Sequence, residues 1–228
     1  MLLPLLGAFR LLASGDLETW GIVWRSLCFA LLSTLFSVLP GLPIGAALAS
    51  LPDSRVRRML AAVVHTLTAV PTVVIGLVVY SLISRSGPLG TLGFLFAPPG
   101  VVMGQVFLAT PVVASLTFAG LAKLDPRFHE TLETFGAGPW TRLAATLREA
   151  RAVLVAALVV AFGRVTGEVG VSMMLGGNIR FSTRTMTTAI ALDAAKGEFE
   201  RAVSLGLVLL VIALAVNLAL HALEPHDA

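Results

Sequence analysis

The sequence predicts an all-α membrane protein with about five transmembrane helices. Of its 228 residues, 57% are hydrophobic and only 13% are charged, and the mean hydropathy is +0.91. A soluble domain of this size cannot bury so much apolar surface, so an integral membrane protein is the expected class. Five apolar stretches also approach the length of about 20 residues that crosses a bilayer.

The chain begins with a segment whose apolar residues recur at roughly helical spacing from Leu2 to Leu12. We expect residues 1–19 to form a helix that lies at the membrane interface. Residues 20–228 are expected to form a single transmembrane domain, because no soluble domain is visible between the apolar runs.

Most of this domain consists of the predicted spans, which are residues 26–50, 59–83, 99–122, 152–173 and 202–222. The segment between the last two spans is too apolar for a plain solvated loop. We therefore expect part of it, residues 184–195, to form a short helix that packs back against the bundle, where protein covers the backbone.

A polar segment at about residues 123–150 separates the third and fourth spans, and we call it the polar hairpin. Its centre, ETLETFGAGPWTRLAATLRE, predicts two short helices. Gly136 and Gly138 mark the turn, and Pro139 suits the first position of the second helix. A few polar residues would suffice to reconnect two spans. We interpret the hairpin as a rigid element that another protein binds.

The distribution of basic residues predicts the orientation. The side of the membrane with the polar hairpin carries Arg55, Arg57, Arg58, Lys123, Arg127, Arg142, Arg148 and Arg151. The opposite side carries fewer: Arg10, Arg85, Arg180, Arg184 and Lys196. Because basic loops face the cytosol, we expect a cytosolic hairpin, an external N-terminus and a cytosolic C-terminus in the inner membrane.

Prolines interrupt three of the spans, at Pro40, Pro43, Pro71 and Pro111. Each removes a backbone donor and is expected to bend its helix. Either the bends serve helix packing, or they shape a pathway and its gate, for which Pro71 and the adjacent Thr72 are candidates. The glycine pairs that sit four residues apart predict close helix contacts; they are Gly41 with Gly45, and Gly163 with Gly167.

Arg164 and Glu168 are unusual because both are charged and both lie in the fourth span. They are four residues apart, on one helical face, and each is costly in hydrocarbon unless paired. Two interpretations remain open: an ion pair that locks the helix, or a polar lining or gate of a pathway. Pairing with Arg164 also argues against Glu168 as a ligand for an anionic substrate.

Beyond this span, Gly176, Gly177 and Asn178 predict a break in the helix. It is either a simple turn or a place where backbone amides face a polar cavity. Arg180 and Arg184 follow near the expected external mouth. They either attract anions electrostatically or contact acidic groups of a docking partner or lipid headgroups.

Several kinds of chemistry have no signal in the chain. Neither lysine stands in a GxxxxGK[ST] frame, so no ATP-binding loop is predicted. The histidines lack metal-ligand spacing, nucleophile motifs are absent, and the basic residues are not clustered as in a nucleic-acid binder. We expect a transporter subunit that is not an enzyme, takes its energy from elsewhere and holds no cofactor.

The polar hairpin resembles the cytosolic loop of ABC-importer permeases, whose pattern is E-A-A, three residues, then G. Glu130 and Gly136 match this pattern, whereas Thr131 and Leu132 replace the two alanines. Glu149, in LREAR, stands where a proline is usual. The runs at residues 69–90 and 163–206, together with LREAR, look like those of tungstate-type permeases in the molybdate/tungstate/sulfate branch.

This resemblance implies a type I, MetI-like bundle that works as a homodimer. Its partners would be two cytosolic ATPase subunits, which use ATP and Mg, and an external oxyanion-binding protein, with the lipid bilayer around it. The cytosolic helix would fit a groove of each ATPase, through residues Glu130, Thr131, Glu133, Gly136, Ala137, Gly138, Pro139 and Trp140. Candidate residues of the pathway or gate are Pro71, Thr72, Arg164, Glu168 and Asn178.

The expected function is therefore import of a tetrahedral oxyanion, tungstate or molybdate, by an ATP-driven complex. Sulfate or another small solute is the alternative substrate within the same class. A secondary transporter that uses Glu168 in a proton relay is a rival from another class. A membrane scaffold whose hairpin only recruits a soluble partner is another.

Overall fold

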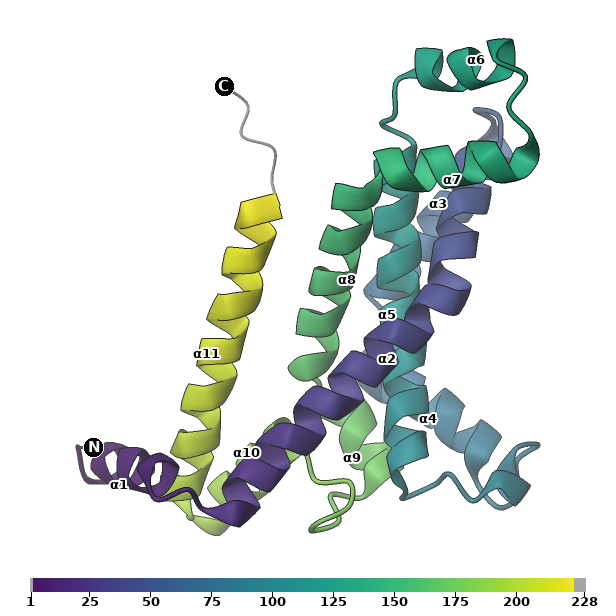
Figure 1. The fold of residues 1–228 in the computed structure, drawn as a ribbon. Helices are drawn as coiled ribbons and strands as arrows, with labels where there is room; N and C mark the ends of the chain where they lie inside the picture. The colour runs from purple at the N-terminus through teal and green to yellow at the C-terminus, as the bar shows by residue number, and fades with distance from the viewer. Residues whose placement is uncertain (1, 224–228) are drawn as a thin grey trace.

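The computed structural model describes residues 2–223, and within them the side chains of residues 2–6, 126, 129, 130, 133, 139, 143 and 223 lie outside the description. Every regular element of the described chain is a helix, and turns and loops connect these helices (Figure 1). Its elements are α1 (Leu2–Ala13), α2 (Leu17–Ser50), α3 (Arg55–Thr68), α4 (Thr72–Ile83), the 3-10 turn η1 (Gly90–Leu92), α5 (Pro98–Leu121), α6 (Pro126–Thr134), α7 (Pro139–Glu149), α8 (Arg151–Thr166), α9 (Gly170–Gly176), α10 (Met186–Lys196) and α11 (Phe199–Leu223).

The expected spans are present with shifted bounds. Three helices are long and apolar enough to cross a membrane: α2, α5 and residues 199–222 of α11. Two bent pairs, α3 with α4 and α8 with α9, bring the number in the described chain to five if each pair is one span. The angle at the break is 94° in the first pair and 63° in the second.

The first span begins earlier than predicted, at Leu17 rather than residue 26. Asp16 caps it, accepting hydrogen bonds from Thr19 N at 2.8 Å and Thr19 Oγ1 at 2.7 Å, which hold the pKa of the Asp16 carboxyl below its ordinary value. The expected N-terminal helix ends at Ala13, so residues 17–19 belong to the first span. A polar cap outweighs the apolar count in deciding where this helix begins.

The prolines of α2 and α5 do not end their helices. Helix α2 continues through Pro40 and Pro43, and α5 through Pro111. Only Pro71 stands at a break, as the residue that precedes α4. The break between α8 and α9 was not expected, because it falls at Gly167 without a proline.

The α2–α5 contact is built on the first glycine pair. A Cβ at Gly41 would lie 2.8 Å from Val113 Cβ, and one at Gly45 would lie 2.5 Å from the carbonyl oxygen of Ala114. These distances confirm the predicted close approach, which any side chain at Gly45 would prevent. The second pair is less close: a Cβ at Gly163 would lie 3.1 Å from Val216 of α11, while Gly167 meets only a carbonyl of its own helix.

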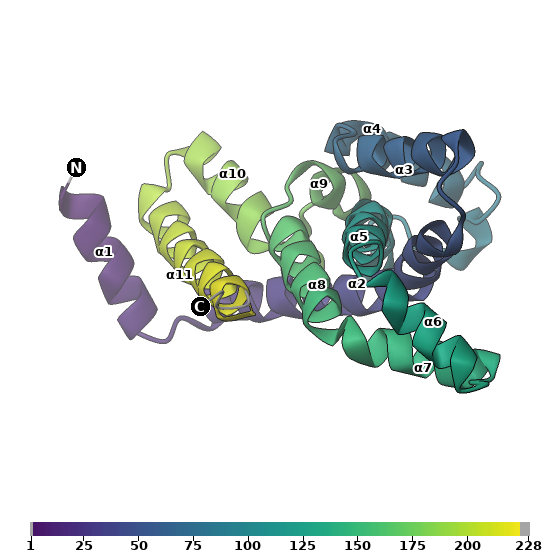
Figure 2. The ribbon, with the colours of Figure 1, turned by 90° about the horizontal axis from the view of Figure 1, so that it is seen from above.

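The expected short helix is α10, which begins and ends within two residues of the predicted bounds. Thr185 forms a capping box with Thr188 at its start, and Gly197, with a φ of 78°, ends it. The Met186 N–H donates to Ser26 Oγ of α2 at 2.7 Å. Viewed from above, α10 lies beside α11 (Figure 2), so it packs against the bundle as predicted.

The two ends of the bundle carry different helices (Figure 1). One end carries α6, α7 and the start of α3. The other carries α1, α9 and α10, and α1 packs on α11, where Ser204 Oγ donates to the carbonyl of Ala8 at 3.2 Å. The basic loops that predicted a cytosolic hairpin therefore lie at the hairpin end. Buried apolar side chains of α2, α5 and α8 fill the space between the ends; they include Ala30, Leu108, Val113 and Val165.

Candidate coupling surface and translocation pathway

The polar hairpin is two short helices joined by a tight turn, as predicted. Asp125 Oδ1 accepts from Arg127 N at 2.9 Å and so caps α6. Gly136 has a φ of 64°, in the left-handed region that other residues occupy only with strain. Pro139 begins α7 in the position where a missing backbone donor costs nothing.

Hydrogen bonds within the hairpin hold the turn. The Ala137 N–H donates to the carbonyl of Leu132 at 3.0 Å. Arg142 Nε donates to the carbonyl of Ala137 at 2.8 Å, and the Arg142 N–H donates to that of Gly138. The hairpin therefore has hydrogen bonds of its own at the turn, where it projects from the bundle (Figure 1).

Two large aromatic side chains flank this turn. Phe135 is 83% exposed and Trp140 is 81% exposed. Trp140 was among the predicted coupling residues, whereas Phe135 was not, although a large apolar residue inside a polar segment was a signal for it. Thr131 is exposed, with its hydroxyl donating to the carbonyl of Arg127. The side chains of Glu130, Glu133 and Pro139 lie outside the described part.

The hairpin continues into α8 with a single residue between the two helices. Ala150 ends α7 and precedes α8: its N–H donates to the carbonyl of Thr146 and its carbonyl accepts from Leu154 N, both at 3.0 Å. Just below, a Cβ at Gly120 of α5 would lie 2.2 Å from Val153 Cγ1. Helix α7 is therefore joined directly to α8, which packs on α5.

At the other end of α8, the predicted ion pair is present. Arg164 Nη1 lies 3.2 Å from Glu168 Oε2, and the Glu168 side chain is 4% exposed against 35% for Arg164. Glu168 Oε1 also accepts from Val171 N at 3.0 Å, so the carboxylate caps the start of α9. The Glu168 carbonyl accepts from Thr187 Oγ1 at 2.6 Å. The pair holds the break between α8 and α9 in place.

The two helix breaks meet at this point. A Cβ at Gly170 would lie 2.9 Å from Thr72 Oγ1 and 3.4 Å from Glu168 Oε1. Thr72 begins α4 directly after Pro71. The structure therefore brings Pro71 and Thr72 next to Glu168, although about a hundred residues separate them in the sequence. Gly170, which permits this approach, was missed.

Asn178 does not join this group. Its φ is 52°, and it follows Gly177 in a left-handed turn. Asn178 Oδ1 accepts from Thr188 Oγ1 at 3.0 Å, and Asn178 Nδ2 donates to the Thr188 carbonyl at 3.3 Å. Its side chain ties the turn to α10, so the simpler of the two interpretations, a turn, fits the geometry.

Arg180 and Arg184 lie at the end of the bundle away from the hairpin, around Glu18 of α2. Both guanidinium groups pair with the Glu18 carboxylate. Arg201 Nη1 lies 3.7 Å from the same carboxylate, and its Nε donates to Asp193 Oδ2 at 2.7 Å. The sequence did not indicate Glu18, Asp193 or Arg201, because their partners are distant in the chain.

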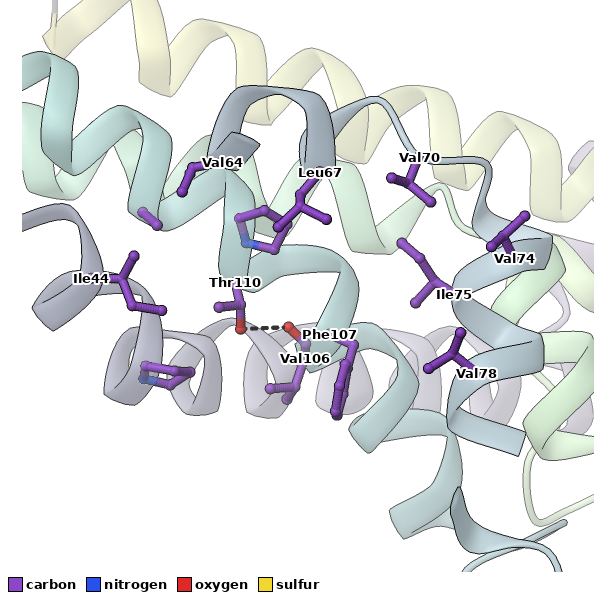
Figure 3. A pocket seen from close by; sticks show the side chains of 13 residues that line it. Ile44, Val64, Leu67, Val70, Val74, Ile75, Val78, Val106, Phe107 and Thr110 are labelled. Carbon is purple, nitrogen blue, oxygen red and sulfur yellow. Dashed lines mark hydrogen bonds between the residues drawn. The ribbon is translucent and has the colours of Figure 1, made fainter. Parts of the chain in front are cut away.

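A third feature is an apolar groove of about 450 Å³ between α2, α3, α4 and α5 (Figure 3). Pro40, Val74 and Phe107 are among the residues that line it. The lining hydroxyl, that of Thr110, donates to the carbonyl of Val106 in its own helix at 2.8 Å. A surface of this kind can pack against another apolar surface. Its lining residues offer no free hydrogen-bond donor to an anion.

A bundle of broken spans with a projecting rigid hairpin is the architecture of a permease that transports solute as part of a larger complex. The chain belongs to the family described as the inner membrane component of binding-protein-dependent transport systems, whose model matches residues 41–226. It is accordingly an ABC importer permease of the tungstate, molybdate and sulfate branch.

Three relatives from tungstate and molybdenum transport systems support this placement. The chain is 33% identical over 217 residues to the tungstate uptake system permease protein TupB of Peptoclostridium acidaminophilum, covering 95% of each chain. It is 37% identical over 172 residues to TupB of Campylobacter jejuni, covering 75% of this chain and 72% of the relative. It is 33% identical over 175 residues to the molybdenum transport system permease protein ModB of Azotobacter vinelandii, covering 72% and 76%.

A solved structure shares the fold. A chain from the inward facing MetNI methionine ABC transporter superposes with a TM-score of 0.69 at 18% sequence identity, over 92% of this chain and 100% of that one. The predicted MetI-like bundle is thus confirmed as the fold.

Proposed function

We propose that this chain forms the membrane pathway of an ATP-driven importer for a tetrahedral oxyanion, tungstate or molybdate. The observation that carries the proposal is the polar hairpin, which presents Phe135 and Trp140 to solvent on a turn fixed by its own hydrogen bonds. Similarity to tungstate uptake permeases supports the substrate class. The complex would comprise two copies of this chain, two ATPase subunits and an external oxyanion-binding protein.

In this proposal the hairpin is the docking element for the ATPase. Aromatic side chains that become buried supply much of the binding energy at interfaces, and both aromatics here stand clear of the bundle. Closure of the ATPases on ATP would push α7, and α8 would move with it because a single residue joins them. The movement then reaches the junction of Glu168 with Thr72, where both bent spans meet, as a largely rigid-body rocking.

The pathway would run between two copies of the chain. Two-fold homodimers are the commonest oligomers, and the apolar groove of Figure 3 is a surface that a second copy can cover without exposing polar groups. Hydrolysis would reverse the rocking and return the pathway to its first state. Weak affinity along the pathway favours release, so the binding protein would set selectivity.

A proton relay through Glu168 is less well supported than coupling to an ATPase. The carboxylate is engaged by Arg164 on one oxygen and by the Val171 N–H on the other. A relay group needs access to both sides, and this one has a role in holding the helix break. The geometry therefore favours a structural or gating role for the pair.

The docking proposal is tested by co-purification with an ABC ATPase subunit of a tungstate or molybdate importer, co-expressed with this chain. The double variant Phe135→Ala with Trp140→Ala is expected to weaken association about 30-fold or more, since one hot-spot aromatic contributes about 2 kcal/mol or more and the losses at neighbouring hot spots do not simply add. Trp24→Ala is the matched control, because Trp24 is also exposed, at 69%, but lies on α2. Association that falls equally in both variants, or in neither, contradicts docking through the hairpin.

The substrate is tested by uptake into proteoliposomes that contain the whole complex. Tungsten and molybdenum inside the vesicles are measured by mass spectrometry, with sulfate as a competitor. We expect accumulation that needs ATP and the binding protein and that persists when a protonophore collapses the proton gradient. Uptake by this chain alone, driven by the gradient, would support the secondary transporter instead.

A further inference from the structure

Arg25 is a charged residue inside the first span, two turns into α2. Its Nε and Nη2 are buried and have no hydrogen-bond partner among the described residues. An unpaired guanidinium at this depth is costly, and such residues in membrane proteins mark functional sites. Arg25 lies beside an apolar run and outside the loops whose basic residues predict the orientation, so the sequence alone did not indicate it.

The side chain of Arg25 runs back along α2 toward the start of the helix. Its Nη1 lies 3.4 Å from the place that a Cβ of Gly21 would take. Glu18 and Arg25 are seven residues apart and therefore share one helical face. The missing side chain at Gly21 gives the guanidinium its room on that face.

Arg184 reaches the same face from the segment between α9 and α10. Its Nη1 lies 3.5 Å from Glu18 Oε1, and its side chain is 11% exposed. Its Nε is buried without a hydrogen-bond partner in the described structure. The hydrogen bond from Met186 N to Ser26 Oγ holds the two segments together beside them.

Among the described residues, the neighbouring carboxylates form ion pairs with the other guanidinium groups and none with Arg25. Glu18 is shared among three guanidinium groups, those of Arg180, Arg184 and Arg201. Arg201 has a further buried partner in Asp193, which accepts from two of its nitrogens at 2.7 Å. Arg25 and Arg184 therefore bring unused N–H donors to the place where α2 meets the segment before α10.

We propose that Arg25 and Arg184 form a binding site for a tetrahedral oxyanion, at the end of the bundle away from the hairpin. Such an anion only accepts hydrogen bonds, and guanidinium groups bind it through paired donors. The neighbouring Glu18 opposes the anion, so binding is moderate and release is possible. Two sources fit this chemistry: the transported oxyanion, which rests on the proposed function, or the phosphate of a phospholipid headgroup, which does not.

The first experiment measures binding to the full-length chain, delipidated in dodecyl maltoside and a phosphate-free buffer. Tungstate and sulfate are titrated by equilibrium dialysis with chloride at matched ionic strength. Where the free oxyanion is the ligand, the wild type binds about one tungstate per chain. Arg25→Gln then lowers the affinity about tenfold or more, the effect of losing a charged hydrogen bond. Arg85→Gln, an equal loss of charge in an exposed loop, leaves it unchanged.

The second experiment tests the lipid source. The chain is placed in nanodiscs that contain phosphatidylglycerol, and native mass spectrometry counts the lipids that stay bound. A phospholipid retained by the wild type and by Arg85→Gln, but lost in Arg25→Gln, supports the site with lipid as its ligand. Tungstate that displaces this lipid shows that both occupy the same place.

Arg184→Gln and Arg25→Lys keep the test decisive if Arg25→Gln does not fold. Both should elute as the wild type does from size exclusion. Arg25→Lys retains the charge without the paired donors, so it should bind more weakly than the wild type and more tightly than Arg184→Gln. Equal tungstate binding and equal lipid retention in the wild type and the folded variants would overturn the site. ATP-driven uptake is measured separately, so that result would leave the importer function standing.

Discussion

The ion pair between Arg164 and Glu168 yields the most specific prediction about stability. Glu168→Ala removes two interactions at once: the contact with Arg164 at 3.2 Å and the acceptor for Val171 N at 3.0 Å. The carboxylate is 4% exposed, so it belongs to the buried class of ion pairs, in which loss of one partner costs about 3–5 kcal/mol.

The exposure of Arg164 lowers this figure. Its side chain is 35% exposed, so solvent screens part of the attraction and the unpaired guanidinium can reach water. We therefore expect Glu168→Ala to lower the free energy of unfolding by about 2–4 kcal/mol. Glu168→Gln keeps an acceptor for Val171 N, so it should cost about 1 kcal/mol less than Glu168→Ala.

The double variant separates pairing from the other losses. With Arg164→Ala also present, no charge is left unpaired, so the loss should be smaller than the sum of the two single losses by about 1–2 kcal/mol. Unfolding of each variant in mixed detergent micelles, followed by circular dichroism, gives the four free energies of the cycle. Losses that add to within about 0.5 kcal/mol would refute a stabilising pair.

Two further predictions use the same unfolding measurement. Gly45→Ala places a methyl carbon 2.5 Å from the Ala114 carbonyl oxygen, so α2 and α5 must separate at a cost of about 1–3 kcal/mol. Gly206→Ala, where a Cβ meets nothing within 4 Å, should cost nothing, and equal effects would contradict the packing argument. Arg201→Ala leaves the fully buried carboxylate of Asp193 unpaired and should cost about 3–5 kcal/mol. Glu198→Ala removes a 53% exposed partner of Arg201 and should cost under about 1 kcal/mol. A larger loss of unfolding free energy in Glu198→Ala than in Arg201→Ala would be evidence against the buried pair.

The polar hairpin and the start of α2, the helix that carries Arg25, lie at opposite ends of the bundle (Figure 1). Between them, α8 joins the hairpin to the break at Glu168, and Thr187, which donates to the Glu168 carbonyl, belongs to α10. Movement of α8 would therefore displace α10 and the segment that carries Arg184. This connection gives the proposed anion site a physical route to the ATPase end.

The spans and the hairpin were predictable from the sequence because their signals are local. Apolar length identifies a segment that crosses a membrane, and Gly136 with Pro139 specifies a turn followed by a helix start. Arg164 and Glu168 could be paired in advance because four residues separate them on one helix. In each case the deciding interaction lies within a few residues of chain.

Only the tertiary structure decided where the polar groups meet. The break at Gly167 has no proline to announce it, and its proximity to Thr72 depends on how two bent helices pack. Glu18 pairs with Arg180, which is 162 positions away in the chain. Among the described residues, Arg25 Nε and Nη2 have no hydrogen-bond partner, although Ser26 beside Arg25 accepts from Met186 N of a distant segment. Such pairings depend on the packing of whole helices, because charge and space at one residue are set by whichever distant segment lies against it.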